Sequence, residues 1–224
     1  MRGPLSSRFW IFTSPLCIKP GPSGRAFLSR QETRRRRRRR ARPALQRLVP
    51  SAVSEHASSP DRYARQARVH GIGAEGQARI ESGSVLVVGC GALGCQVIDL
   101  LARAGVGSLT LVDRDLVEWT NLQRQTLFDE RDAREQTPKA LAAARRVSEV
   151  NASVRVGPHV LDVARESIEA VVRQAQPDVV ADCTDNFETR YLLNDLCVRD
   201  SLALSYAGVV STRAMAMMVI PGQT

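Results

Sequence analysis

The chain lacks several of the patterns that assign a protein to a common class. It has no run of eighteen apolar residues, so no membrane-spanning helix is expected. Its three histidines are scattered without an H-E-x-x-H pattern, and no G-x-S-x-G elbow occurs. The sequence therefore offers neither a metalloprotease motif nor a hydrolase nucleophile, and no general base is evident.

The cysteines favour neither a disulfide framework nor a zinc site. Their positions are Cys17, Cys90, Cys95, Cys183 and Cys197, with no C-x-x-C pair and no spacing typical of a disulfide framework. Cys90 and Cys95 are too few for a zinc site. A free cysteine beside an apolar run is usually a small buried residue, so we expect packing roles. Free thiols fit a reducing compartment, and the cytoplasm is the expected location.

Basic charge is concentrated at one end of the chain. Residues 1–60 hold fourteen Arg and Lys residues against two acidic ones, a net charge of +12, whereas residues 61–224 hold 18 basic and 21 acidic residues, a net charge of −3. Because the basic charge is not spread over the second part, neither a nucleic-acid surface nor a nucleic-acid partner is expected for that part.

Residues 1–60 are predicted to be a disordered Arg-rich leader. Arg34–Arg40 form an unbroken row of like charges, and no apolar residue recurs there with a helical period. Its role stays open between an organelle transit peptide, an electrostatic contact with nucleic acid or an anionic surface, and an upstream extension without function. Residues 61–224 form the predicted folded domain, which ends in the turn-like Pro221–Thr224 and is expected to be truncated at its C-terminus.

The second part alternates apolar runs with helical patterns. Strands are predicted at Val85–Val88, Leu109–Val112, Val154–Val156, Val179–Ala181, Leu202–Tyr206 and Met215–Ile220, the last as a buried strand. Helices are predicted at Leu93–Ala104, Pro138–Val150, Arg165–Gln176 and Phe187–Asp200, after two short helical pieces between Asp61 and Ile80. This order predicts an α/β, Rossmann-like fold: a mainly parallel twisted sheet with helices on both faces.

Three polar or glycine-rich segments follow predicted strands of this sheet. They are the turn Gly89–Gly94, Asp113 and Asp185. In such sheets ligands bind outside the carboxyl ends of the strands, so the three segments should meet at one site. Glycines let a backbone approach phosphate closely, and the next helix offers its N-terminal N–H groups to the anion. Asp113 lies nineteen residues past Gly94, where a ribose-binding acid is expected.

Charged groups near that site favour a triphosphate. Arg124 and Lys139, with Arg65 as a further candidate, can neutralise phosphates, while Asn121 and Gln123 can orient phosphate oxygens. Asp185 can hold Mg²⁺, which prefers oxygen ligands. A cation at the start of a helix opposes the helix dipole, so Lys139 indicates an anionic ligand. Hydride transfer needs no such cluster. Attack by a carboxylate on an α-phosphate also needs no general base, because the carboxylate is already ionised at neutral pH.

A series of motifs then appears in a fixed order. They are Arg62–Gln66, Gly76-Gln77, Gly89–Gly94, Ala104–Gly107, Asp113–Asp115, Asn121–Gln125, Pro138–Ala140 and Thr184–Phe187. Over about residues 61–224 the chain resembles the HesA/MoeB/ThiF family, prokaryotic relatives of ubiquitin-activating enzymes. The resemblance implies a Rossmann-like domain that uses ATP and Mg²⁺ to adenylate the C-terminal glycine of a ubiquitin-like sulfur-carrier protein, for molybdopterin, thiamine or a related cofactor.

The resemblance also implies roles for single positions. The nucleotide would contact Gly89, Gly91, Ala92, Gly94, Asp113, Asp115, Asn121, Gln123, Arg124, Lys139, Asp185 and Asn186. Arg65, Arg124, Lys139 and Asp185 would be the catalytic group, with Asp185 also the metal ligand. Arg65 matches an arginine that reaches the phosphates of the neighbouring subunit, which implies a homodimer.

Departures from the family are visible, among them Thr120 where Ser is commoner. Ala92 stands where many members have a third glycine, and the two cysteine pairs that bind zinc in longer members are absent. Asp115 has a secondary polar or structural role as its alternative, and Asp185 with Asn186 can simply cap the helix that follows. The rival functions are a non-catalytic module that binds nucleotide or carrier, an NAD-dependent oxidoreductase, and adenylation of a non-protein carboxylate or a modified tRNA base.

Overall fold

The computed structural model describes residues 62–223. The predicted leader at residues 1–60 lies outside the described residues and stays a prediction. In the part that is described, six strands form one sheet: β1 (Ser84–Val88), β2 (Ser108–Val112), β3 (Arg155–His159), β4 (Val179–Asp182), β5 (Ala203–Val210) and β6 (Arg213–Val219). Their spatial order is β3-β2-β1-β4-β5-β6. All neighbouring pairs are parallel except β5 and β6, which form an antiparallel hairpin.

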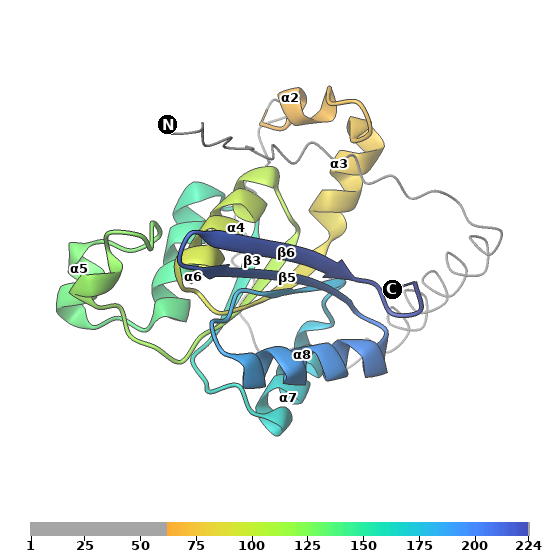
Figure 1. Ribbon diagram of the computed structural model, residues 1–224. Coiled ribbons are helices and arrows are strands. Elements are labelled where there is room, and N and C mark those ends of the chain that lie inside the picture. The colour runs from red at the N-terminus through yellow and green to blue at the C-terminus, as the bar shows by residue number, and fades with distance from the viewer. Residues whose placement is uncertain (1–61, 224) are drawn as a thin grey trace, which may run out of the picture. The chain divides into compact units, whose positions relative to one another are not determined.

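Helices cover both faces of this sheet (Figure 1). The helices are α2 (Ala64–Ala67), α3 (Gly73–Ser82), α4 (Ala92–Ala104), α5 (Glu130–Glu135), α6 (Lys139–Val150), α7 (Arg165–Ala175) and α8 (Phe187–Asp200), with a 3₁₀ turn η1 at Trp119–Asn121. Helices α4 and α6 pack on one face, and α7 and α8 on the other. The predicted Rossmann-like α/β architecture is confirmed.

The alternation of side chains along β1 explains the two cores. Val87 belongs to the core beneath α4 and α6, whereas Leu86 and Val88 belong to the core beneath α7 and α8. Successive side chains of a strand point to opposite faces, so a strand buried on both faces must be apolar throughout. Leu86, Val87 and Val88 are fully buried, which is why this short run predicted a buried strand correctly.

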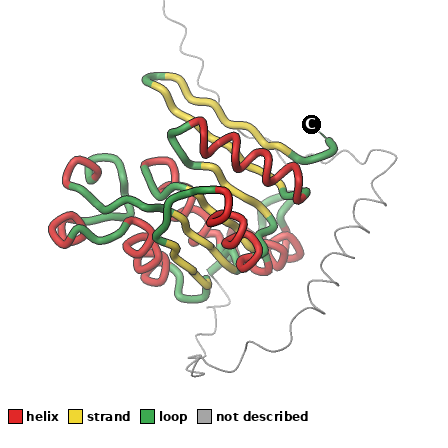
Figure 2. Tube along the Cα trace, turned by 90° about the horizontal axis from the view of Figure 1, so that it is seen from below, coloured by secondary structure: helices red, strands yellow, loops and turns green. Residues whose placement is uncertain are grey.

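The last two strands differ from the prediction. Strand β5 continues four residues beyond its pairing with β4, and this overhang pairs with the first half of β6. Figure 2 shows the hairpin at one edge of the sheet. The prediction that Met215, Met217 and Met218 are buried is wrong, because they are 61%, 51% and 45% exposed. Every residue of β6 before Val219 is exposed, and an apolar pattern records only the preference of side chains, not whether a covering layer is present.

Two smaller differences concern helix boundaries and short elements. Pro138 is the N-cap of α6 rather than its first helical residue, because its ψ of 131° is extended and it bridges to Leu116. The short elements η1 and α5 were not predicted. No helix in the described part of the chain is both long enough and apolar enough to cross a membrane.

Candidate functional site

The carboxyl ends of the central strands lie level with one another. Val88, the last residue of β1, pairs with Val112 of β2 and with Asp182 of β4. The segments that follow these strands are therefore neighbours, as predicted: the N–H of Gly89 donates to Val112 (2.8 Å), and that of Cys183 donates to Val88 (2.9 Å). This carboxyl edge brings together three of the segments that the sequence singled out.

The glycine turn packs the start of α4 closely against the end of β1. Gly89 has a φ of +92°, a conformation that side chains rarely adopt. A Cβ on Gly94 would lie 1.9 Å from the carbonyl oxygen of Gly89. The helix bonds begin only where the N–H of Cys95 donates to Gly91, so the preceding N–H groups are left for an anion. Gly91 and Ala92 are half-buried at this helix start.

Asp113 joins the end of β2 to the glycine turn. Its Oδ2 accepts from the N–H of Cys90 (2.7 Å) and its Oδ1 from the N–H of Asp115 (2.8 Å). Burial raises the pKa of this carboxyl above its usual value, although both backbone hydrogen bonds oppose the rise. The two backbone hydrogen bonds hold the carboxylate of Asp113 in place. Each of its oxygens can accept a further hydrogen bond, so Asp113 can accept from ribose hydroxyls.

Lys139 is a buried cation at the start of α6. Its side chain is 9% exposed, and Nζ lies 2.9 Å from Oδ2 of Asp115. The backbone fixes the same pair, because the N–H of Lys139 donates to the carbonyl of Asp115 (2.9 Å). Asp115 is thus a partner of Lys139 in the structure, which agrees with the structural alternative for this residue. The carboxylate is more than half exposed, so an arriving phosphate can compete for the ammonium group.

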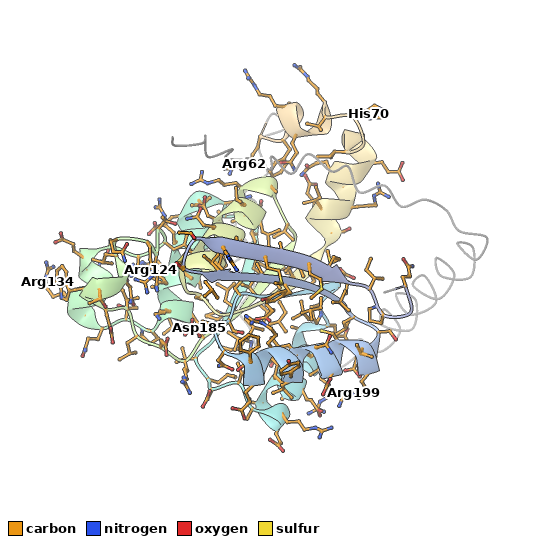
Figure 3. The ribbon with its side chains drawn as sticks, in the orientation of Figure 1. Arg62, His70, Arg124, Arg134, Asp185 and Arg199 are labelled. Carbon is orange, nitrogen blue, oxygen red and sulfur yellow. The ribbon has the colours of Figure 1, made fainter. Side chains whose placement is uncertain are left out.

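The segment around η1 supplies the other polar groups. Asn121 is buried, and its Oδ1 accepts from the N–H of Glu118 (3.2 Å), which leaves its amide nitrogen as the group able to donate to an anion. Arg124 is exposed and donates to the carbonyl of Thr120 (3.0 Å), while Gln123 is exposed. Figure 3 shows Arg124 and Asp185 towards the same end of the sheet.

Asp185 lies in the loop between β4 and α8. It is exposed, and its carboxylate makes no hydrogen bond or ion pair with another described residue. Asn186 is the N-cap of α8, because its Oδ1 accepts from the N–H of Thr189 (2.8 Å). Of the two residues, Asn186 therefore caps the helix and Asp185 stays available to a cation.

The described residues fit Mg²⁺ only as part of a complex with phosphates. Residues 62–223 contain no group of three or more His, Cys, Asp or Glu side chains that could hold a metal. Mg²⁺ commonly binds through one or two carboxylates together with substrate phosphates. A single unpaired carboxylate beside a glycine turn suits that mode, with Asp185 as the protein ligand.

Arg65 is the predicted site residue that the fold does not bring to the carboxyl edge. Helix α2 is attached at the opposite end of α4, where Gln66 and Gln77 both donate to the carbonyl of Ala104 (3.1 and 3.2 Å). Helix α4 has thirteen residues and separates this point from the glycine turn by about 20 Å. Arg65 is exposed there, so it cannot reach the phosphate position of its own chain.

Three thiols lie in the glycine turn or next to it. Cys90, Cys95 and Cys183 are buried, as predicted, and so is Cys197 on α8. Burial raises the pKa of Cys95 to about 11 and that of Cys183 to about 12, because a thiolate is poorly solvated there. A thiol with a raised pKa and no solvent access is a poor nucleophile, so these groups pack the turn rather than react.

Three residues of this edge were missed by the sequence analysis. Asp182 is completely buried and pairs with Arg190 of α8 (3.2 Å), and Gln125 is buried with no partner for its Oε1 within residues 62–223. The charge of Asp182 at the end of an apolar run was a usable signal. Arg190, eight residues later, offered no such signal, since only the packing of α8 brings it to Asp182.

Comparison with known proteins assigns the chain to a protein family. The model of the ThiF family matches residues 63–224. The chain is 41% identical over 163 residues to a sulfur carrier protein ThiS adenylyltransferase of Bacillus subtilis, covering 73% of this chain and 48% of that protein. It is 46% identical over 165 residues to an adenylyltransferase and sulfurtransferase MOCS3 of Danio rerio, covering 73% of this chain and 35% of that protein.

A third relative and a solved structure are similar to this chain over a comparable share of its length. The chain is 41% identical over 169 residues to a SAMP-activating enzyme E1 of Haloferax volcanii, covering 75% of this chain and 61% of that protein. A crystal structure of E. coli MccB with ATP superimposes with a TM-score of 0.66 at 28% identity, covering 73% of this chain and 50% of MccB. The chain thus spans between about a third and three fifths of the length of these relatives.

Proposed function

The chain belongs to the ThiF family, and on that basis we propose that it is an ATP-dependent adenylyltransferase. Its substrate is the C-terminal glycine of a small ubiquitin-like sulfur-carrier protein. Relatives named for ThiS and as MOCS3 match at 41% and 46% identity, so the proposal extends to the class of carrier and to cofactor biosynthesis of the thiamine or molybdopterin type.

The proposal is carried by one observation: the glycine turn, Asp113, Lys139 and Asp185, whose carboxylate has no partner among the described residues, all follow the carboxyl ends of neighbouring strands or pair with residues that do. A glycine turn with a ribose-binding acid serves many nucleotides. Lys139 and Arg124 add positive charge, and Asp185 adds a ligand for a divalent cation. Together these groups suit a triphosphate better than the pyrophosphate of NAD, so hydride transfer is disfavoured.

Each residue has a defined part in binding. The N–H groups at the start of α4 receive phosphate oxygens, and Asp113 accepts from the ribose hydroxyls. When ATP binds, the ammonium group of Lys139 leaves the carboxylate of Asp115 for a phosphate oxygen. Its positive charge is therefore neutralised both before and after binding. Arg124 leaves the carbonyl of Thr120, a neutral acceptor, for an anionic oxygen, which makes the stronger hydrogen bond.

The chemical step is a nucleotidyl transfer. A carboxylate oxygen of the carrier's C-terminal glycine attacks the α-phosphorus of ATP, a new O–P bond forms, and the bond to the β-phosphate breaks to release pyrophosphate. No proton has to be removed, because the carboxylate is ionised at neutral pH. Catalysis is alignment of the two substrates plus stabilisation of the developing charge by Lys139 and Arg124. Mg²⁺, held by Asp185 and the phosphates, supplies further charge stabilisation when bound.

We also propose a homodimer with shared sites. Arg65 lies at the end of α4 remote from its own glycine turn, so it serves a phosphate site only if that site belongs to a second copy of the chain. A closed twofold arrangement would make the exchange reciprocal. The cytoplasm remains the proposed location, since the four described cysteines are free thiols, which suits a reducing compartment.

The direct test is radioactive pyrophosphate–ATP exchange with a ThiS-type sulfur carrier or a carrier of molybdopterin biosynthesis. Exchange should require Mg²⁺ and the carrier's C-terminal glycine. Lys139→Met, which keeps the apolar stem, should slow exchange by about 100-fold, the usual loss for one group that stabilises transition-state charge. Arg146→Met on the same helix is the matched control and should exchange like the unaltered protein, because Arg146 only pairs with Glu149 at the surface.

The rivals predict different results. An NAD-dependent oxidoreductase would bind NADH and catalyse no exchange. A binding module would retain the carrier or nucleotide without exchange. Exchange with a small carboxylate or a tRNA, and not with a carrier, would keep the adenylation chemistry and overturn the proposed substrate.

A further inference from the structure

Hydrogen bonds hold the loop from Asp182 to Asn186 in place on both sides of Asp185. Asp182 is fully buried at the end of β4, and its Oδ1 accepts from both the N–H (3.0 Å) and the hydroxyl (2.7 Å) of Thr184. Asn186 is fixed as the cap of α8. Cys183 is buried and its N–H is bonded to Val88. Asp185 stands between these fixed points.

Arg190 closes this arrangement from α8. Its Nε donates to Oδ2 of Asp182 (3.2 Å), and its Nη2 donates to the carbonyl of Thr184 (2.8 Å). With Asp182 and Arg190 in place, the N–H, the hydroxyl and the carbonyl of Thr184 all have partners. The guanidinium carbon also lies 4.3 Å from the ring centroid of Tyr206 on β5, and 5.0 Å from that of Phe187. Arg190 therefore joins β4, β5, α8 and the loop.

Asp185 is excluded from this network. It is exposed and has no hydrogen-bonding or ionic partner among the described residues, although Arg190 of α8 contacts the same loop and is only 16% exposed. Arg190 donates to Asp182 and Thr184 and lies against two rings, and it forms no ion pair with Asp185. The loop is rigid while its exposed carboxylate stays free, which is the arrangement that a cation ligand needs.

We infer that Arg190 is a positioning residue that fixes the Thr184–Asn186 backbone and so holds Asp185 ready for the divalent cation of the nucleotide complex. This inference rests on the proposed function, because the cation arrives with the phosphates. Groups that orient a metal ligand without touching the metal typically change metal affinity by 10- to 100-fold when replaced. Loss of Arg190 should therefore weaken the metal and leave the nucleotide contacts at Gly91 and Asp113 intact.

The test is a Mn²⁺ titration followed by electron paramagnetic resonance, with saturating α,β-methylene ATP present. Arg190→Met should weaken Mn²⁺ binding by about 10- to 100-fold, and Arg190→Lys by less, because a lysine keeps the charge and loses the forked geometry. Binding of the metal-free nucleotide should stay unchanged. In the exchange reaction the Mg²⁺ requirement should rise, and excess Mg²⁺ should restore the rate.

Two further variants keep the test decisive. Arg199→Met is the matched control on α8, since Arg199 pairs at the surface with Glu169 and Asp200, and it should bind Mn²⁺ like the unaltered protein. Tyr206→Leu removes one ring from Arg190 without removing a charge and should weaken Mn²⁺ binding by a few-fold. It decides the question together with Arg190→Lys if Arg190→Met does not fold.

The outcomes separate the two proposals. Folded Arg190 variants that bind Mn²⁺ normally, even with a lower melting temperature, would show that Arg190 only stabilises the fold, and the inference is then wrong. If the unaltered protein binds no Mn²⁺–nucleotide complex at all, the proposed function fails and this inference fails with it.

Discussion

Gly91 and Gly94 are three residues apart, and a methyl group would meet different surroundings at each. At Gly94 it would collide with the carbonyl of Gly89, whereas at Gly91 it would meet no atom within 4 Å. Gly94→Ala should therefore lower the free energy of unfolding by about 3 kcal/mol, because packed backbone has to move. Gly91→Ala should stay within about 0.5 kcal/mol of the original stability.

The same pair of variants tests the phosphate position. If the open space at Gly91 receives a phosphate, Gly91→Ala should weaken ATP binding by about tenfold, or about 1.4 kcal/mol, at unchanged stability. Urea unfolding and calorimetric titration with ATP measure the two quantities. Full ATP affinity in Gly91→Ala would mean that the phosphates lie elsewhere.

The residues of the site differ in how far their positions and roles could be predicted from the sequence. Asp113 and Lys139 were predicted from local patterns, a strand end and a helix start, and both occur where expected. Asp115 had two interpretations, a nucleotide contact and a structural role, and its distance of 2.9 Å to Lys139 is known only from the tertiary structure. The role of Arg190 depends on how β4, α8 and β5 pack against one another, and no local pattern contains that information.

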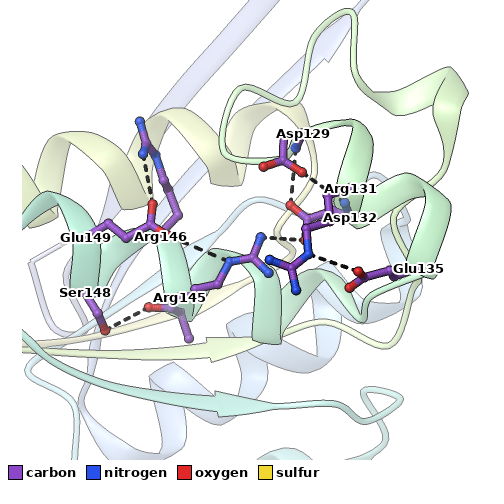
Figure 4. Close-up of polar contacts among 9 residues, drawn as sticks. Asp129, Arg131, Asp132, Glu135, Arg145, Arg146, Ser148 and Glu149 are labelled. Carbon is purple, nitrogen blue, oxygen red and sulfur yellow. Dashed lines mark hydrogen bonds and ion pairs between the residues drawn. The ribbon is translucent and has the colours of Figure 1, made fainter.

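At the scale of elements, one buried ion pair attaches α5 to α6. Asp132 of α5 is completely buried, and its Oδ1 accepts from Nη2 of Arg145 on α6 (2.7 Å; Figure 4). Asp132 also accepts from the N–H of Asp129 within a capping box. Helix α5 leads directly into the turn that ends at Lys139, so this pair supports the start of α6.

Breaking this pair should destabilise the domain. Arg145→Met leaves the carboxylate of Asp132 buried without its cation, which should cost about 2 kcal/mol, below the range for fully buried pairs because Arg145 is partly exposed. Arg146→Met removes only a surface pair with Glu149 and should cost about 0.5 kcal/mol or less. Urea denaturation compares the two, and equal losses would contradict the assigned role of Asp132.

Elements were predicted well where the chain is periodic and buried, and poorly elsewhere. Strands β1, β2 and β4 were located to within a residue or two, because burial on both faces demands a continuous apolar run. The short α5 and η1 have too few residues for a period, and capping groups define them instead. The end of β5 could not be predicted either, because its overhang is paired only by β6.

For the whole molecule, the proposed shared sites predict complementation between inactive variants. Arg65→Ala and Asp185→Asn should each lose about 100-fold in pyrophosphate exchange. After subunits mix in equal amounts, half of the dimers are mixed, and each contains one intact site out of two. The mixture should therefore regain about a quarter of the original activity.

The control for this experiment uses two residues of one subunit's site. Lys139→Met and Asp185→Asn each damage the site of the subunit that carries them, because Lys139 and Asp185 serve the phosphate site of their own chain, so both sites of a mixed dimer are damaged. Their mixture should regain no activity. If Arg65→Ala and Asp185→Asn also fail to complement, or light scattering finds monomers at assay concentration, the shared-site dimer is wrong.

The sequence by itself determined the order of strands and helices and the strand ends at which polar residues collect, because burial and helix capping act on neighbouring residues. Tertiary structure decided what depends on distance across the fold: the pairing of Lys139 with Asp115, the network that leaves Asp185 free, the separation of Arg65 from its own glycine turn, and the exposure of the methionines on β6. Apolar and charged side chains carry fixed preferences, but which surfaces meet is settled only when the sheet and helices have packed.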